Sequence, residues 1–125
     1  MMSQELSLSP TAKAVLVEIS EALQRFIDLG ETWTIFINKM SLSSEERQGI
    51  RDFLGMGSIK IKLTESDEPA EWIESSIPGV WYGVFYDQID QPILETIEIG
   101  KFPQIPSAQI EDVKIGIETL RQRLL

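Results

Sequence analysis

The middle of the chain is the part whose pattern most constrains the fold. Between residues 59 and 99, four segments of strand-like composition follow one another, separated only by short turns. The first, residues 59–63, alternates strictly between isoleucine or leucine and lysine, which is typical of a strand with one buried face. The others cover residues 71–76, 80–86 and 93–99. Consecutive hairpins of this kind predict an antiparallel meander.

The turns of this region carry their own signals. Residues 65–69 and 87–91 are rich in acidic and turn-forming side chains and are expected to join hairpin strands. Between the second and third segments, Pro78 cannot donate to a strand ladder and Gly79 permits unusual backbone angles. We therefore interpret residues 77–79 as a kink or bulge, and Pro78 and Gly79 as a candidate structural motif.

Helical patterns lie on both sides of the meander. Residues 10–29 form one apolar stripe, with Ser9 and Pro10 suited to the helix start and Gly30 to its end. Ser43 and Glu46 have capping-box spacing and predict a helix up to residue 54, with inward-facing Ile50, Phe53 and Leu54. Ser107 is expected to cap a last helix with apolar residues Ile110, Val113, Ile117, Leu120 and Leu124.

One further strand is expected over residues 32–38, and its near-continuous apolar centre predicts an interior position in the sheet. The complete expected order is α-β-α-β-β-β-β-α. This order describes an α+β fold with a largely antiparallel sheet and helices packed mainly on one face. We expect a single domain over residues 9–125 behind a flexible lead over residues 1–8.

The chain contains no cysteine and no histidine, which excludes whole classes of chemistry. Thiolate nucleophiles, disulfides, the usual zinc sites, iron–sulfur ligation and histidine acid–base catalysis all need residues that it lacks. We therefore expect a protein that is not an enzyme and has no cofactor or metal. The sequence shows no signal peptide and no apolar run long enough for a membrane span, so a cytoplasmic location is expected.

The negative charge is concentrated in one part of the chain. The formal net charge is −9, from 20 acidic and 11 basic residues. Nine of the acids lie between Leu63 and Gly100, where there is no lysine or arginine: Glu65, Asp67, Glu68, Glu71, Glu74, Asp87, Asp90, Glu95 and Glu98. Such a field repels nucleic acid and attracts a basic polypeptide. The alternative is that these charges only keep a small protein soluble.

Neither of the close carboxylate pairs is suited to catalysis. Glu71 and Glu74, like Glu95 and Glu98, are three residues apart, which on a strand places the two members on opposite faces. Asp87 and Asp90 flank a turn, where aspartate is common for local hydrogen bonding. Residues 65–68 lack the spacing of a calcium loop and are interpreted as a solvated turn.

The segment 80–86 is the most aromatic in the chain, and both of its faces are apolar. Tyr82 and Tyr86 share one face, whereas Trp81 and Phe85 share the other. Aromatic side chains at strand spacing serve either in a core or in an interface. We predict Trp81, Tyr82, Tyr86, Glu95 and Glu98 as candidate partner-contact residues, and the core alternative stays open for the aromatic ones.

Several ordered motifs resemble one known family. They are Ile77-Pro78-Gly79-Val80-Trp81 before an aromatic strand, Leu94-Glu95-Thr96-Ile97-Glu98-Ile99-Gly100 with Pro103 close behind, and, earlier, Gly30-Glu31-Thr32-Trp33 and Leu42-Ser43-Ser44-Glu45-Glu46-Arg47. The combination is similar to the C-terminal domain of hydrogenase expression proteins of the HupH/HyaF type. The resemblance implies an accessory, chaperone-like role in maturation of [NiFe] hydrogenase, with the small-subunit precursor or other maturation proteins as partners. It supplies no catalytic residue.

Three functional hypotheses follow. The first is a binding module whose acidic sheet region and exposed edge strand accept an extended basic segment, such as the twin-arginine signal that hydrogenase small-subunit precursors generally carry. The second is a homodimer in which Tyr82 and Tyr86 pack across a two-fold axis. The third is an enzyme that uses carboxylates alone, which would require a deep pocket with converging acids.

Overall fold

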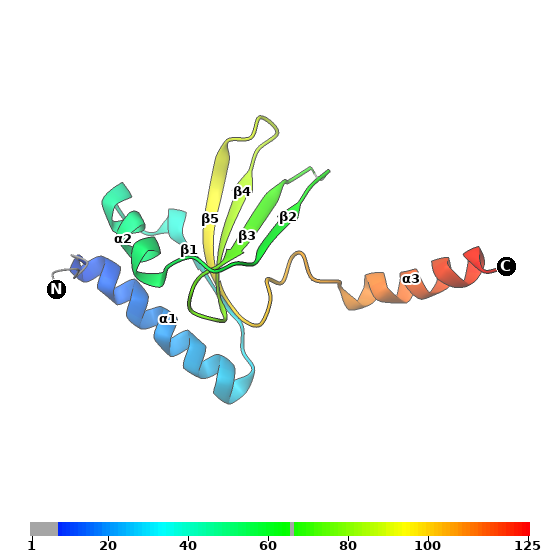
Figure 1. Ribbon diagram of the computed structural model, residues 1–125, viewed down its shortest axis with the longest axis horizontal. Helices are drawn as coiled ribbons and strands as arrows, with labels where there is room; N and C mark the ends of the chain where they lie inside the picture. Colours follow the sequence, from blue (N-terminus) through cyan, green and yellow to red (C-terminus); the bar gives the residue numbers. More distant parts are fainter. Residues whose placement is uncertain (1–7, 66) are drawn as a thin grey trace.

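The computed structural model describes residues 8–65 and 67–125. Its elements, in order, are α1 (Pro10–Leu29), β1 (Trp33–Phe36), the 3-10 turn η1 (Ile37–Lys39), α2 (Ser44–Leu54), β2 (Lys60–Leu63), β3 (Ala70–Glu74), β4 (Val80–Tyr86), β5 (Pro92–Ile99) and α3 (Ile110–Arg123). This order, shown in Figure 1, confirms the predicted α+β fold. Residues 1–7 of the predicted flexible lead lie outside the described residues.

Local capping chemistry defines both ends of α1 as predicted. The Ser9 hydroxyl accepts a hydrogen bond from the Ala12 N–H at 3.0 Å, and Pro10 occupies the first turn. At the other end, Gly30 adopts a left-handed conformation with φ of 73° and donates its N–H to the Phe26 carbonyl. Between these caps, a stripe at helical spacing is buried, consisting of Ala12, Val15, Ile19 and Ala22.

The predicted capping box of α2 is present. The Ser43 hydroxyl accepts from the Glu46 N–H, and the Glu46 carboxylate accepts from the Ser43 N–H at 2.9 Å. Ile50 and Leu54 are buried as expected, but Phe53 is 55% exposed, so its predicted inward orientation is wrong. Consecutive helical residues are about 100° apart. The helix therefore cannot turn both Leu54 and Phe53 toward the same narrow contact with the sheet.

The five strands form one antiparallel sheet in the order β1-β5-β4-β3-β2. β1 lies at an edge and pairs only with β5, so the interior position predicted for this strand is wrong. In β1 only Ile35 is buried, and the next buried residue, Ile37, already belongs to η1. The apolar run therefore reflects an edge strand followed by a turn whose first residue is buried.

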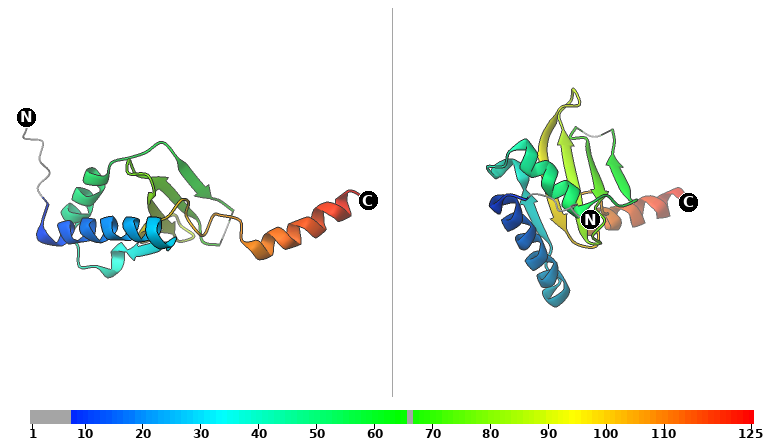
Figure 2. Two further views of the ribbon diagram at one scale, coloured as in Figure 1. Left: turned by 90° about the horizontal axis from the view of Figure 1, so that it is seen from below. Right: turned by 60° about the vertical axis from the view of Figure 1, so that its left-hand side comes forward.

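The two faces of the sheet have different surroundings. α1 and α2 cover one face, where Val80, Tyr82, Ile97 and Ile99 join the helices in the main core. Figure 2 shows both helices on this side of the sheet. On the other face, a second cluster contains Ala70, Trp72 and Trp81, with partly buried residues from β2 and β4 around it. The two faces of β4 thus belong to two different cores. This arrangement explains why both faces of the strand are apolar, as the sequence indicates.

Pro78 and Gly79 lie in the turn that joins β3 to β4, with Gly79 at φ of 92°. The interpretation of residues 77–79 as a kink or bulge is corrected to a hairpin turn. The Val80 N–H donates to the Ile77 carbonyl at 3.1 Å and closes this turn. The register shift in this sheet lies instead at the other end of β4, between Phe85 and Tyr86.

The C-terminal helix α3 leaves the body of the molecule. Residues 100–109 form an irregular connection, after which α3 projects away from the sheet, and no residue of α3 is buried. Figures 1 and 2 show this projection from several directions. The predicted cap at Ser107 is wrong: Gln109 occupies the N-cap position, and the Ser107 hydroxyl donates to the Gln104 carbonyl instead. Among the residues described, none of the helices combines the length and apolar character required to cross a membrane.

Candidate functional site: the open face of the sheet

The sheet face that α1 and α2 leave uncovered carries an apolar groove, which we call the open-face groove. It has a cavity volume of about 360 Å³. Strands β1, β4 and β5, the β2–β3 turn and the connection to α3 all contribute to its lining. The lining residues are Thr34, Phe36, Glu68, Phe85, Tyr86, Ile93, Leu94, Thr96, Glu98, Gln104 and Ile105. The exposed large apolar residues of this lining are Phe36, Ile93 and Ile105. An exposed apolar patch in a hollow is typical of a surface that binds a macromolecule.

A buried polar network supports this face. The Trp72 indole Nε1–H donates to the Glu98 Oε2 atom at 2.8 Å, and the Thr96 hydroxyl donates to the same oxygen at 2.9 Å. The Phe85 ring meets the Trp72 ring edge to face, with centroids 5.5 Å apart. These contacts satisfy the polar atoms inside an otherwise apolar cluster and hold Glu98 in one position.

Trp81 lies deeper on the same face and binds the start of the connection to α3. Its indole Nε1–H donates to the Gly100 carbonyl at 3.2 Å. Its ring packs edge to face with Phe102, at a centroid distance of 5.8 Å. Trp81 therefore attaches the beginning of the connection to the sheet.

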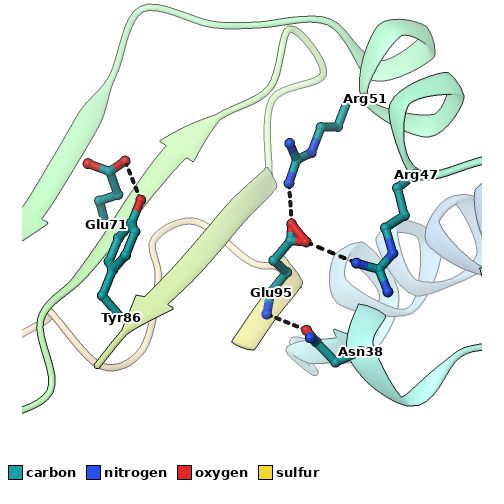
Figure 3. A network of polar contacts seen from close by, with 6 residues as sticks. All are labelled: Asn38, Arg47, Arg51, Glu71, Tyr86 and Glu95. Carbon is teal, nitrogen blue, oxygen red and sulfur yellow. Dashed lines mark hydrogen bonds and ion pairs between the residues drawn. The ribbon is translucent and has the colours of Figure 1, made fainter. Parts of the chain in front are cut away.

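The opposite face carries a network of charged residues between the sheet and α2, shown in Figure 3. Glu95 forms ion pairs with Arg47, at 3.5 Å, and with Arg51, and its backbone N–H donates to the Asn38 side-chain oxygen. Because two guanidinium groups face one carboxylate, the negative charge of Glu95 is compensated within the molecule. Glu95 therefore joins α2 and η1 to β5.

Glu71 and Tyr86, also drawn in Figure 3, form a separate polar contact, and Tyr86 in addition lines the open-face groove. The Tyr86 hydroxyl donates to Glu71 at 3.2 Å, and the Lys60 ammonium lies 3.8 Å from the other oxygen of that carboxylate. Burial, followed by the neighbouring Glu71 charge, raises the pKa of Tyr86 above its ordinary value. The pairs Glu71/Glu74 and Glu95/Glu98 thus have their members on opposite faces, as the strand alternation predicted.

Tyr82 is buried under α2, and its hydroxyl lies 3.2 Å from the carbonyl oxygens of both Arg51 and Gly55. Burial raises the pKa of Tyr82 to about 12, because ionisation would place a charge in the core. Folding therefore favours the protonated form of the Tyr82 hydroxyl. The stability contributed by this proton is complete below the ordinary pKa of 10 and is lost as the pH rises from 10 to about 12.

A tyrosinate titration tests this assignment. The chain has two tyrosines, so the variant Tyr86→Phe leaves Tyr82 as the sole reporter. Its ultraviolet absorbance is expected to titrate with a midpoint near 12 in the folded protein. In strong denaturant the midpoint should return to about 10. A midpoint near 10 in the folded protein would show that the hydroxyl is accessible to water.

The acidic residues gather at one end of the sheet. The turns β2–β3 and β4–β5 lie side by side at this end (Figure 1) and carry Glu65, Asp67, Glu68, Asp87 and Asp90. We call these five residues the acidic rim. Glu68 also lines the open-face groove, so the rim and the groove are continuous. Asp87 has the local role that was predicted for a turn aspartate, because it accepts the N–H groups of Ile89 and Gln91 at 2.9 Å each.

The structure separates the predicted contact residues into two groups. Trp81, Tyr82 and Glu98 are buried, and the first two belong to different cores. Only Tyr86 and Glu98 are brought together at the groove, while Glu95 lies on the helix-covered side. A contact role for the five residues therefore stays a prediction.

Sequence reasoning missed the exposed apolar residues of the groove. The sequence places Phe36 in a strand that it predicts to be interior, and Ile105 in a loop. Phe36 lies between two isoleucines and Ile105 between glutamine and proline, and neither pattern indicates which surface the side chain joins. Ile93 was expected in a strand but without a role.

Together, the single antiparallel sheet, the two helices on one face and the open groove on the other define a small α+β protein. The family model of the C-terminal conserved region of HupH hydrogenase expression proteins matches residues 10–125. The chain therefore belongs to this family, which confirms the family that the ordered motifs resemble.

Curated relatives agree with this assignment. The chain is 28% identical over 113 residues to the hydrogenase expression/formation protein HoxQ of Azotobacter vinelandii, covering 89% of this chain and 40% of the relative. It is 26% identical over 107 residues to HupH of Rhizobium leguminosarum bv. viciae, covering 86% and 38%. The chain thus spans about two fifths of the length of these relatives.

The fold itself has been seen in a solved structure. The hydrogenase expression protein HupH from Thiobacillus denitrificans superposes with a TM-score of 0.84 at 24% identity, covering 94% of this chain and 98% of that chain. Since α3 holds 14 of 125 residues, about 11% of the chain, a match over 94% includes at least part of α3.

Proposed function

We propose that this protein is a non-catalytic accessory factor in hydrogenase expression that acts by binding the precursor of the hydrogenase small subunit. Its family and the names of its curated relatives support the accessory role. The observation that carries the binding mode is the continuity of the open-face groove with the acidic rim. A groove of this kind suits a segment that is apolar along its length and basic at one end.

Two physical effects favour such a ligand. Apolar side chains of the ligand lose contact with water when they enter the groove beside Phe36, Ile93 and Ile105, at about 25 cal/mol for each Å² buried. Lysine or arginine side chains at its end are attracted by the rim, because no basic residue occurs between residues 63 and 100 of this chain. A signal segment with twin arginines combines both properties.

The edges of the sheet favour the groove over strand addition as the binding mode. β2 is an edge strand of only four residues, and its lysines Lys60 and Lys62 are exposed. Short, lysine-bearing edges resist pairing with a further strand. The edge at β1 is equally short and ends in the turn η1. We therefore assign the ligand to the sheet face rather than to an edge.

A peptide titration tests the proposal. A fluorescent peptide with the signal sequence of a small-subunit precursor is expected to bind, and its affinity should fall about tenfold or more between low and high salt. The variant Glu65→Gln/Asp67→Asn/Asp90→Asn, which removes three charges from the rim, should weaken binding at low salt by a similar factor.

The matched control removes three charges elsewhere. In Glu21→Gln/Asp28→Asn/Glu31→Gln the same change in net charge is made on and just after α1, outside the groove lining, and the affinity for the peptide should remain within about twofold. Absent binding, or binding that does not respond to salt, contradicts the proposal. Equal loss in both triple variants would show that only the overall charge matters.

A further inference from the structure

The helix α3 has an apolar stripe that nothing in the described chain covers. Residues Ile110, Val113, Ile117, Leu120 and Leu124 follow one another at alternating spacings of three and four, and their exposed fractions range from 45% to 77%. Such spacing places all five on one side of the helix. An apolar stripe of this length on an isolated surface helix is the signature of a missing partner surface.

The stability of α3 leads to the same conclusion. The helix has 14 residues, and helices shorter than about 15 residues are marginal in water without tertiary contacts. Within α3, Lys114 and Glu111 form an exposed ion pair at 3.5 Å, and a single exposed pair of this kind stabilises a helix only weakly. Gln109 supplies no side-chain cap, and Gly116 lies in the middle. The helix therefore needs a surface against which to pack.

The same chain carries an apolar surface without a cover, the open-face groove. Its own α3 does not lie there, because the connection leads the chain away: Phe102 packs on Trp81, Ile105 lines the groove, and α3 then projects outward. The apolar stripe of α3 and the groove of the same molecule are thus both uncovered, and α3 projects away from the groove.

We propose that α3 of a second copy of this chain lies in the open-face groove, and that the exchange is reciprocal about a two-fold axis. In such an isologous dimer each chain donates one helix and accepts one, so both apolar surfaces are covered at once. A pairing of α3 with α3 alone would leave the groove bare. The proposed client segment takes the same groove and therefore competes with α3 of the second copy, so the dimer is the state of the protein without client.

The dimensions of the two surfaces agree. A helix of 14 residues is about 21 Å long, and a strand of eight residues such as β5 is about 27 Å long, so α3 fits along the groove. A stable interface buries about 1,600 Å² in total. Because the exchange has two equivalent helix–groove contacts, each of them needs to bury only about half of that area.

The charges agree as well. The last turn of α3 contains Arg121 and Arg123 and follows Glu118, the last acidic residue of the chain. The acidic rim lies at one end of the groove and contains no basic residue. Opposite charges at the end of a helix and at the end of its groove favour one orientation, with the C-terminal turn of α3 beside the rim.

The oligomeric state tests the proposal directly. Size-exclusion chromatography with light scattering is expected to give, for the wild-type protein, a mass of twice 14.2 kDa. Two variants, Ile117→Asp/Leu120→Asp on the helix stripe and Ile93→Asp in the groove, should each raise the dissociation constant of the dimer more than about 100-fold, because each substitution acts in both contacts. Circular dichroism of the sheet checks that both variants are folded.

Two controls carry the same chemical change outside the proposed interface. Ile115→Asp lies on the face of α3 opposite to the stripe and outside its last turn, and Ile77→Asp lies in the β3–β4 turn, at the end of the sheet away from the acidic rim and outside the groove lining. Both should remain dimeric with an unchanged dissociation constant. A monomeric wild type, or a dimer that neither interface variant weakens, would overturn the proposal.

Mixing the two interface variants distinguishes exchange from pairing of the helices. The groove variant still has a normal α3, and the helix variant still has a normal groove, so one of the two contacts can form between them. We therefore expect a heterodimer in the mixture although each variant alone is monomeric. If only the helix variant dissociates and mixing restores nothing, the helices pair with each other and the groove assignment is wrong.

Discussion

Replacing Trp72 with alanine is expected to lower the free energy of unfolding by about 4 kcal/mol, a large part of the total stability of a small domain. Trp72 is completely buried and forms the centre of the cluster under the open-face groove. The substitution removes an indole ring that packs against Phe85 and leaves a cavity. The substitution also removes the hydrogen bond that the indole N–H donates to the buried Glu98 carboxylate. The loss of packing and the loss of a polar partner therefore add.

Chemical denaturation followed by circular dichroism measures this effect. The matched control is Trp33→Ala, because Trp33 is 47% exposed and its indole N–H donates to Glu18 at the surface. This change should cost less than about 1 kcal/mol. All variants are compared at one protein concentration, since association would shift apparent stability. Similar losses for the two tryptophans would contradict the arrangement of the cluster.

The variant Gly83→Ala is expected to lower the free energy of unfolding by about 3 kcal/mol, although it adds only one methyl group. A Cβ atom at Gly83 would lie 2.3 Å from the Thr96 hydroxyl oxygen, 2.9 Å from Glu98 Oε2 and 3.0 Å from Trp72 Nε1. The methyl group therefore enters the polar network and forces its members apart. Because these groups are buried, they cannot exchange their hydrogen bonds for bonds to water.

A second substitution separates steric conflict from other causes. In Gly83→Ala/Thr96→Ala the nearest atom is removed, so the double variant should be more stable than the sum of the two single losses predicts. The control Gly116→Ala introduces the same methyl group on α3, where nothing lies within 4 Å. It should leave the protein as stable as the wild type or slightly more stable, because alanine favours the helix. A Gly83→Ala variant of wild-type stability would contradict the close packing.

Elements with a local cause were predictable. The caps of α1 and α2 depend on residues three or four positions apart, Ser9 with Ala12 and Ser43 with Glu46, and both are present. The meander of β2 to β5 was predictable for a similar reason, because each strand pairs with its neighbour in the chain. The family was also recognisable, since its motifs are short and occur in order.

Predictions failed where a residue's surroundings come from distant parts of the chain. The apolar run in β1 was consistent with an interior strand, but the pairing of β1 with β5 places it at the edge. Phe53 has a helical position as favourable as that of Leu54, yet only one of the two faces the sheet. The sequence likewise left open whether the candidate aromatic residues lie in a core or in an interface. In the structure, Trp81 and Tyr82 are buried in two separate cores.

Residue order alone determined the type and sequence of the elements, the alternation of the acidic pairs and the absence of thiol and imidazole chemistry. These properties depend on hydrogen bonds, side-chain periods and residue types that are local to each segment. Only the tertiary structure decided which face of the sheet is bare, that the rim and the groove are continuous, and that α3 lies apart from both. The physical reason is that burial is a property of the whole fold, because each apolar stripe can be covered only by whatever surface the rest of the chain, or another molecule, brings against it.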